Sequence, residues 1–183
     1  MSGTLQVGGV TLATHTESPS TLTLGNVSLT DEYYLQGKVN ATYSTNDLTS
    51  IKKINFNGST EPYWVFTGDT TNFVQGTTIS DLKIIKAGIY LVNFSSSCGN
   101  SSSERSIENA IYGVGSGSTS VLAKTNDGIS YVDQGYSYGS GTVALVYKFN
   151  ANDQISFGVN SNEQGDADIR DWTHFNICLI RPL

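Results

Sequence analysis

The sequence is poor in charge, cysteine, proline and histidine. Only 14% of its 183 residues are charged, and it holds two Cys, three Pro and two His. The longest basic run is Lys52–Lys53, and the formal net charge is −6. These numbers exclude the basic patch through which proteins bind nucleic acid or anionic membranes.

Long apolar runs are also missing. No stretch reaches the length of a transmembrane helix, and the first residues, MSGTLQVGG, have neither the basic nor the apolar region of a secretory signal. We therefore expect a chain that is made in the cytoplasm and does not insert into membranes.

Residues with metal-binding or nucleophilic chemistry are too few to mark an active site. Cys98 and Cys178 form no disulfide framework, and we expect buried thiols that act as small apolar groups. A single bridge between them remains open if their strands are neighbours. Two Cys and two His at these spacings make no zinc site, and neither a nucleophile elbow nor a phosphate-binding loop is present. We predict a protein that is not an enzyme and carries no cofactor.

Strand-forming residues and polar turns dominate the rest. Residues 141–160, GTVALVYKFNANDQISFGVN, alternate apolar and polar positions, turn at Asn150–Asp153 and alternate again. The run Tyr63–Phe66 alternates too, so Trp64 and Phe66 belong to one face, which we assign to the core rather than to a carbohydrate platform. Repeated strands of this kind without helical periodicity predict an all-β antiparallel sandwich or barrel.

The first thirty residues contain two copies of one short pattern. Leu5–Leu12 reads LQVGGVTL and Leu22–Leu29 reads LTLGNVSL. Each copy is too short to bury a core alone, so we predict an attachment segment and neck at 1–47, followed by a head domain at 48–183. In a trimer, the segments can close into a β-prism or add strands to a partner; otherwise the repeat is a coincidence of composition. The predicted attachment residues are Leu5, Val7, Val10, Leu12, Leu22, Leu24, Val27 and Leu29.

One acidic cluster precedes the last strand. Asp166, Asp168 and Asp171 lie within GDADIRD, and closely spaced carboxylates in a loop can bind Ca²⁺. The glycine and the final glutamate of an EF-hand are absent, and Arg170 can neutralise the cluster by pairing with it. A solvated acidic loop is therefore the alternative to a calcium site.

Three stretches resemble the jelly rolls of the tumour necrosis factor and complement globular-head family. GIYLVNFSSS at Gly88–Ser97 resembles the family's Gly-X-Tyr strand, and Phe149–Ile155 is similar to its turn between paired strands. FNICLIRPL at Phe175–Leu183 is similar to its terminal strand. The resemblance covers roughly residues 50–183 and implies an antiparallel jelly-roll β-sandwich that assembles as a homotrimer.

Tyrosines crowd the region before the paired strands. We assign Tyr131, Tyr136, Tyr138 and Tyr147 to the trimer interface, with amphipathic surface tyrosines as the alternative.

The N-terminal repeats resemble segments of structural proteins of tailed bacteriophages, fibres above all.

Together these features predict a virion structural protein. We expect a trimeric capsid decoration, cement or head-fibre subunit that is attached to a capsid or other virion protein by its N-terminal segment. The alternative is a tail-fibre tip or receptor-binding module that recognises a host surface glycan. Its recognition loops would then be Ser95–Ser103, Gly113–Ser118 and Asn160–Asp171.

Overall fold

The computed structural model describes the chain in segments. Its backbone is described over residues 3–7, 10–17, 20–24, 27–30, 33–47, 51–56, 62–100, 107–115, 118–127, 131–133, 136–161 and 164–183. Side chains are described over 33–43, 51–56, 62–99, 108–113, 119–125, 139–160 and 168–183. Within these residues, no helix has the length and apolarity of a membrane span.

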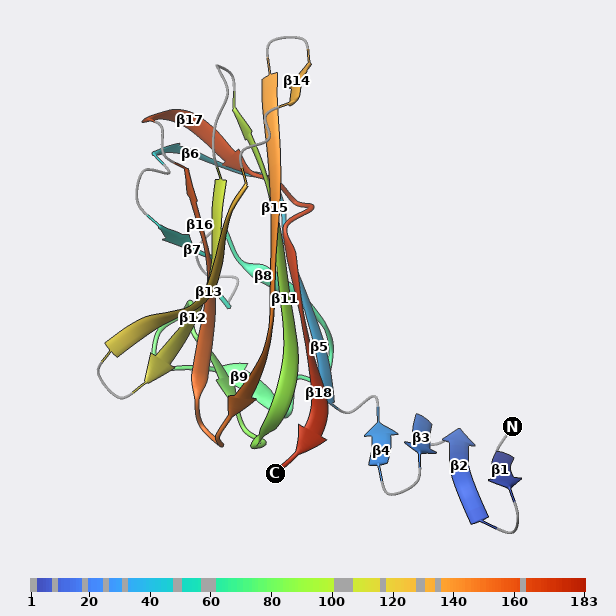
Figure 1. Cartoon of the computed structure of the whole chain (residues 1–183). Coiled ribbons are helices and arrows are strands. Elements are labelled where there is room, and N and C mark those ends of the chain that lie inside the picture. The colour runs from blue at the N-terminus through green and yellow to red at the C-terminus, as the bar shows by residue number, and fades with distance from the viewer. Residues whose placement is uncertain are drawn as a thin grey trace.

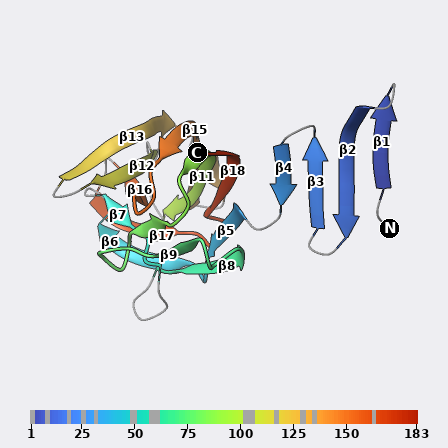
Figure 2. The same cartoon turned by 90° about the horizontal axis from the view of Figure 1, so that it is seen from below.

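Residues 3–30 form a sheet of their own. Its four antiparallel strands follow one another in chain order: β1 (Gly3–Val7), β2 (Val10–Glu17), β3 (Ser20–Leu24) and β4 (Val27–Thr30). None of these strands pairs with a later strand among the residues described. Figures 1 and 2 show this N-terminal sheet beside the rest of the molecule and not within it.

The larger sheet of the remaining chain has eight strands. Its main path runs β14-β15-β11-β18-β5-β8, and β17 pairs with both β11 and β6. The strands are β5 (Tyr34–Val39), β6 (Tyr43–Asp47), β8 (Trp64–Gly68), β11 (Gly88–Asn100), β14 (Tyr131–Asp133), β15 (Tyr136–Phe149), β17 (Gln164–Ile169) and β18 (His174–Pro182).

The second sheet has six strands and packs face to face with the first (Figure 1). Its path runs β13-β12-β16-β10-β9, with β7 beside β16. The strands are β7 (Lys52–Lys53), β9 (Phe73–Gln75), β10 (Leu82–Ile84), β12 (Ile107–Gly115), β13 (Ser118–Asp127) and β16 (Gln154–Ser161). All strand pairs in both sheets are antiparallel, which confirms the predicted all-β antiparallel sandwich.

Aromatic rings fill the space between the two sheets. Phe157 of β16 stacks on Phe175 of β18, with ring centroids 4.4 Å apart, and Trp64 meets Phe175 edge-on at 4.8 Å. All three side chains are buried. Trp64 is therefore a core residue, as its alternation with the exposed Val65 predicts, because edge-to-face and stacked pairs at these distances stabilise a core beyond the area they bury.

The sandwich begins earlier in the chain than the boundary at residue 47. β5 pairs with β18 on one side and with β8 on the other, so it lies inside the sheet. β6 pairs with β17. Residues 34–47, which the sequence assigned to a neck, thus belong to the sandwich, and the N-terminal sheet is joined to it by the short connection between β4 and β5.

Three stretches that were predicted as loops are largely strand. Within Asn160–Asp171, residues 160–161 end β16 and residues 164–169 form β17. β11 continues through Ser95–Asn100 because it pairs with β15 along its whole length and with β17 at its end. Glycine-rich residues 113–115 likewise pair in β12. The turn at Asn150–Asp153 is confirmed, and Asn152 takes a positive φ of 72° there.

Candidate functional site

The outward face of the eight-stranded sheet carries a row of apolar residues. The register places Val146 of β15 opposite Leu91 of β11, Leu91 opposite Cys178 of β18, and Cys178 opposite Tyr34 of β5. We call these four residues the outer row. Leu91 is 44% exposed and Val146 is 62% exposed, while Ile180, two residues along β18, is 42% exposed. Apolar residues that line up across four strands form a patch, unlike single apolar residues scattered over a surface.

The next row on the same face has amide side chains at three of its four positions. It runs Ala144, Asn93, Asn176 and Gln36 across the same four strands. The Tyr34 hydroxyl, which has one proton to donate, lies 3.1 Å from Asn176 Oδ1 and 3.2 Å from Gln36 Oε1. Asn93 Oδ1 is buried and lacks a hydrogen-bond partner among the described residues. The face thus combines an apolar row with adjacent amide groups.

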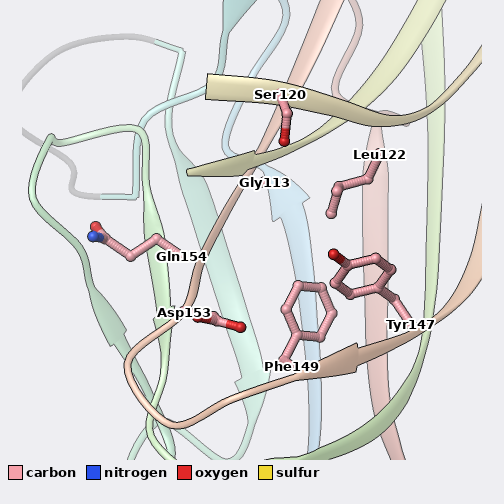
Figure 3. A pocket seen from close by; sticks show the side chains of 7 residues that line it. All are labelled: Gly113, Ser120, Leu122, Tyr147, Phe149, Asp153 and Gln154. Atoms are coloured by element: carbon pink, nitrogen blue, oxygen red, sulfur yellow. The ribbon is translucent and has the colours of Figure 1, made fainter. Parts of the chain in front are cut away.

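A pocket opens at one edge of the sandwich, where β13 and β15 part. Its volume is about 160 Å³, and Figure 3 shows the Tyr147 and Phe149 rings together on one wall. The lining residues are Gly113, Ser120, Leu122, Tyr147, Phe149, Asp153 and Gln154. The ring centroids of Tyr147 and Phe149 are 4.8 Å apart.

Two polar side chains that line this pocket already form hydrogen bonds within the protein. Asp153 Oδ2 accepts a hydrogen bond from the Asn150 amide at 2.7 Å, and Gln154 Nε2 donates to Thr77 Oγ1 at 2.9 Å. Neither a cysteine nor a histidine lines the pocket. The arrangement offers a small recess with both polar and apolar walls, and its lining residues do not include the paired nucleophile and base of a catalytic centre.

Cys98, Cys178 and His174 carry the thiol and imidazole groups among the described side chains. Both cysteines are free. Cys98 is buried as predicted, and burial raises its pKa to about 12, so its thiol is not ionised near neutral pH. Cys178 is exposed, so the prediction of a buried thiol there is wrong; β18 places it in the outward-facing outer row. His174 Nδ1 lies 2.9 Å from the Trp172 carbonyl oxygen.

The predicted calcium ligands are described only in part. Asp168 Oδ2 lies 3.2 Å from Arg170 Nη2, which is the pairing that the sequence suggested as the alternative to calcium. Asp171 belongs to the turn that follows β17, and the side chain of Asp166 lies outside the described residues. No group of three acidic, cysteine or histidine side chains that could hold a metal occurs in the described part. The calcium site stays a prediction.

The four predicted interface tyrosines separate into two places. Tyr131 and Tyr138 are cross-strand partners, and Tyr136 pairs with Asp133 at the start of β15; all three side chains lie outside the described residues. Tyr147 is exposed and lines the pocket. Their role in a trimer stays a prediction, and the outer row is a second surface that the sequence analysis did not identify.

Seven of the eight predicted attachment residues lie on one face of the N-terminal sheet. Residues directly opposite each other share a face, and so do alternate residues of one strand. One row runs Leu5, Ala13, Leu24 and Val27, and the row beside it runs Gly3, His15, Leu22 and Leu29.

A β-bulge in β2 keeps a third row on the same face. Leu5 pairs with Ala13 but Gln6 pairs with Thr11, so Leu12 is the extra residue, and Val7 and Val10 face each other beyond it. We call the face with these three rows the apolar face. Its reverse carries the following polar residues: Thr4, Gln6, Thr11, Thr14, Thr16, Thr21, Thr23, Ser28 and Thr30.

Comparison with known proteins identifies the fold. No protein-family model matches the sequence, and neither does any curated protein. Among solved structures, murine APRIL crystallised at pH 5.0 has 12% identity and a TM-score of 0.57, over 81% of this chain and 98% of APRIL. The Eiger TNF of S. frugiperda has 9% identity and a TM-score of 0.55, over 82% of this chain and 94% of that one. The sandwich therefore has a tumour necrosis factor-like jelly-roll fold.

Proposed function

We propose that this chain is a non-enzymatic structural protein of a virus particle, in which a trimeric jelly-roll head is carried by the N-terminal sheet. The observation that carries the proposal is the division of the chain: residues 3–30 form their own amphipathic sheet, and the sandwich begins only at β5. A head needs no such appendage for its own core, whereas a protein mounted on a larger assembly does.

The outer row supports a homotrimer. An antiparallel sheet that faces water normally carries polar residues on its outward side, yet Val146, Leu91 and Cys178 lie side by side there. Covering this patch with a second copy removes apolar area from water. The sequence resemblance to trimeric jelly rolls favours two further copies as the cover.

The virion assignment is supported by the N-terminal sequence. The repeats at Leu5–Leu12 and Leu22–Leu29 resemble segments of bacteriophage structural proteins, and they form the separate sheet. We infer that this sheet contacts a capsid or other virion protein. The described side chains contain neither an activated thiol nor a metal cluster, which favours a structural over an enzymatic role.

A second function has one observation in its favour. β17 pairs with the end of β11 and with β6 at the end of the sandwich away from the N-terminal sheet (Figure 1). A protein mounted at one end presents the other end outward, as a receptor-binding module for a host surface glycan would. The two functions differ in whether the head itself binds cells.

The trimer is tested by light scattering after size-exclusion chromatography of the full chain. We expect three times the 19.6 kDa chain mass. Leu91→Lys should run as a monomer, because three ammonium groups cannot be buried in the outer row. Ile79→Lys is the matched control, since Ile79 is 40% exposed but lies in the turn before β10. A monomeric wild-type chain would refute the trimer.

Attachment is tested on purified particles of the virus that encodes the chain. An antibody against the head should label intact particles, and the full chain should bind stripped particles, whereas residues 33–183 should not. Unlabelled particles would refute the virion role. Binding of residues 33–183 to host cells would favour the receptor-binding module instead.

A further inference from the structure

We propose that the apolar face of the N-terminal sheet packs against the same face of two other copies. Residues 3–30 of three chains would then form a three-sided β-prism on the axis of the head. The threonine-rich face would lie outside, available to the particle. This inference rests on the proposed trimer.

The N-terminal sheet is amphipathic. The bulge at Leu12 shifts the alternation of β2 by one residue, so that Val10 lies on the same face as Ala13. The apolar face thus carries seven of the eight predicted attachment residues, and the reverse carries only Thr, Ser and Gln. A single-layer sheet cannot bury one face against itself, so stable sheets of this kind pack on a second layer. No strand pairing joins this sheet to the sandwich in the described residues, and Figure 2 shows it to one side.

The apolar face carries very little charge. The apolar face has a single acidic residue, Glu17, which pairs with Ser20 in the last row of β2 and β3. It has no Lys or Arg, and its only other titratable residue is His15. Identical faces can therefore meet without opposing like charges along most of their length, which is the requirement for packing copies of one surface around an axis.

The N-terminal sheet is tethered to the sandwich next to the outer row. Only three residues separate Thr30, the end of β4, from Tyr34, which opens β5 and is itself part of the outer row. A fully extended connection of this length spans at most about 14 Å. Heads that meet through the outer row would therefore hold three N-terminal sheets close together, at an effective concentration of about millimolar. This continuity favours copies of the chain over a particle protein as the cover of the apolar face.

The experiment compares neighbouring positions on opposite faces. Leu24→Cys lies on the apolar face and Thr23→Cys on the threonine-rich face of the same strand. Both are made in full-length chains that carry Cys178→Ser, so that the buried Cys98 is the only other thiol. A short bismaleimide is used because it tolerates thiol separations that a disulfide does not.

The expected result is a covalent dimer for Leu24→Cys, with one chain of each trimer left over, and little product for Thr23→Cys. Light scattering on the same samples separates the two proposals. A trimer in which Leu24→Cys takes up monofunctional maleimide freely and forms no dimer overturns the prism and leaves the head trimer standing. Equal cross-linking at both positions also overturns it. Because Cys178 belongs to the outer row, the wild-type chain is measured beside these samples, and a monomer in light scattering of both overturns the proposed trimer itself.

Discussion

At the scale of single residues, the burial of Tyr90 should make the free energy of unfolding fall at alkaline pH. Its hydroxyl donates to the Lys86 carbonyl oxygen at 2.7 Å, and burial, with smaller effects of Tyr33 and Asp69, raises its pKa to about 12. The unfolded phenol ionises near pH 10. The contribution of Tyr90 to the free energy of unfolding is therefore fully present below pH 10 and is lost as the pH rises from 10 to 12.

Tyr90→Phe tests this dependence. Its free energy of unfolding should be about 1 kcal/mol lower at pH 8, because one hydrogen bond is lost. Between pH 10 and 12 it should fall less steeply than that of the wild type, by up to about 1.4 kcal/mol per pH unit. Urea titrations at several pH values measure both. Burial also raises the pKa values of Tyr112 and Cys98 to about 12. The free energy of unfolding of the variant should therefore still fall somewhat as the pH rises. Identical slopes would contradict the assignment to Tyr90.

A glycine beside the aromatic core sets a second residue-scale prediction. Gly37 of β5 lies opposite Phe175, and a Cβ at this position would overlap the Phe175 ring. The ring cannot move away, because Phe157 stacks on it and Trp64 meets its edge. We expect Gly37→Ala to lower the free energy of unfolding by about 1–3 kcal/mol in urea titrations. The exposed neighbour Lys38→Ala should change it by less than about 0.5 kcal/mol. Equal effects of the two substitutions would show that the core yields.

At the scale of elements, the turn between β15 and β16 depends on Asn152. Its φ of 72° is tolerated by Asn and Gly but not by β-branched residues. The turn also holds β10, because the Asn152 amide donates to the Ile84 carbonyl at 2.7 Å and the Ile84 amide donates to the Asp153 carbonyl at 2.9 Å. Asn152→Val should lower the free energy of unfolding by about 1–2 kcal/mol, and Asn152→Gly should not. Thermal unfolding of the two variants measures the difference; matching midpoints would contradict it.

Elements with strong alternation were predictable from the sequence, and elements held by distant partners were not. β15, β16 and the aromatic strand β8 alternate clearly, so their faces follow from the pattern. β5 is a short strand whose partner β18 lies at the other end of the chain, and no local pattern reports such a pairing. The serine-rich end of β11 has a composition typical of a loop, but Ser96 is buried there and donates a hydrogen bond to Asn109 Oδ1.

At the scale of the whole molecule, the sequence located one candidate surface and missed the other. The N-terminal repeats were visible because the same pattern occurs twice within thirty residues. The outer row draws its residues from four strands that only the fold aligns. One signal was present in the sequence. In GIYLVNF, apolar residues occur in both series of alternate positions, which is typical of a strand covered on both faces. Tyr90 and Val92 are buried in the core, whereas Leu91 on the other face is 44% exposed.

Trimer formation predicts a concentration-dependent midpoint of thermal unfolding. If three chains unfold together into monomers, a tenfold rise in protein concentration stabilises the trimer by 2RT ln 10, which is about 2.7 kcal/mol. Three chains of this length have an unfolding entropy of about 1.2 kcal/mol/K, so the midpoint should rise by about 2 °C for each tenfold step. Differential scanning calorimetry over two decades of concentration measures this shift.

Two variants locate the origin of that shift. Residues 33–183 should keep it, because the outer row lies in the sandwich, although their midpoint should be lower at every concentration if the N-terminal sheets also pack together. Leu91→Lys should lose it, because the monomer that remains unfolds without dissociating. A wild-type midpoint independent of concentration would mean that the outer row faces water in the native protein. The shift should also disappear from residues 33–183 if the N-terminal sheets alone hold the copies together, and the trimer interface would then lie in residues 3–30.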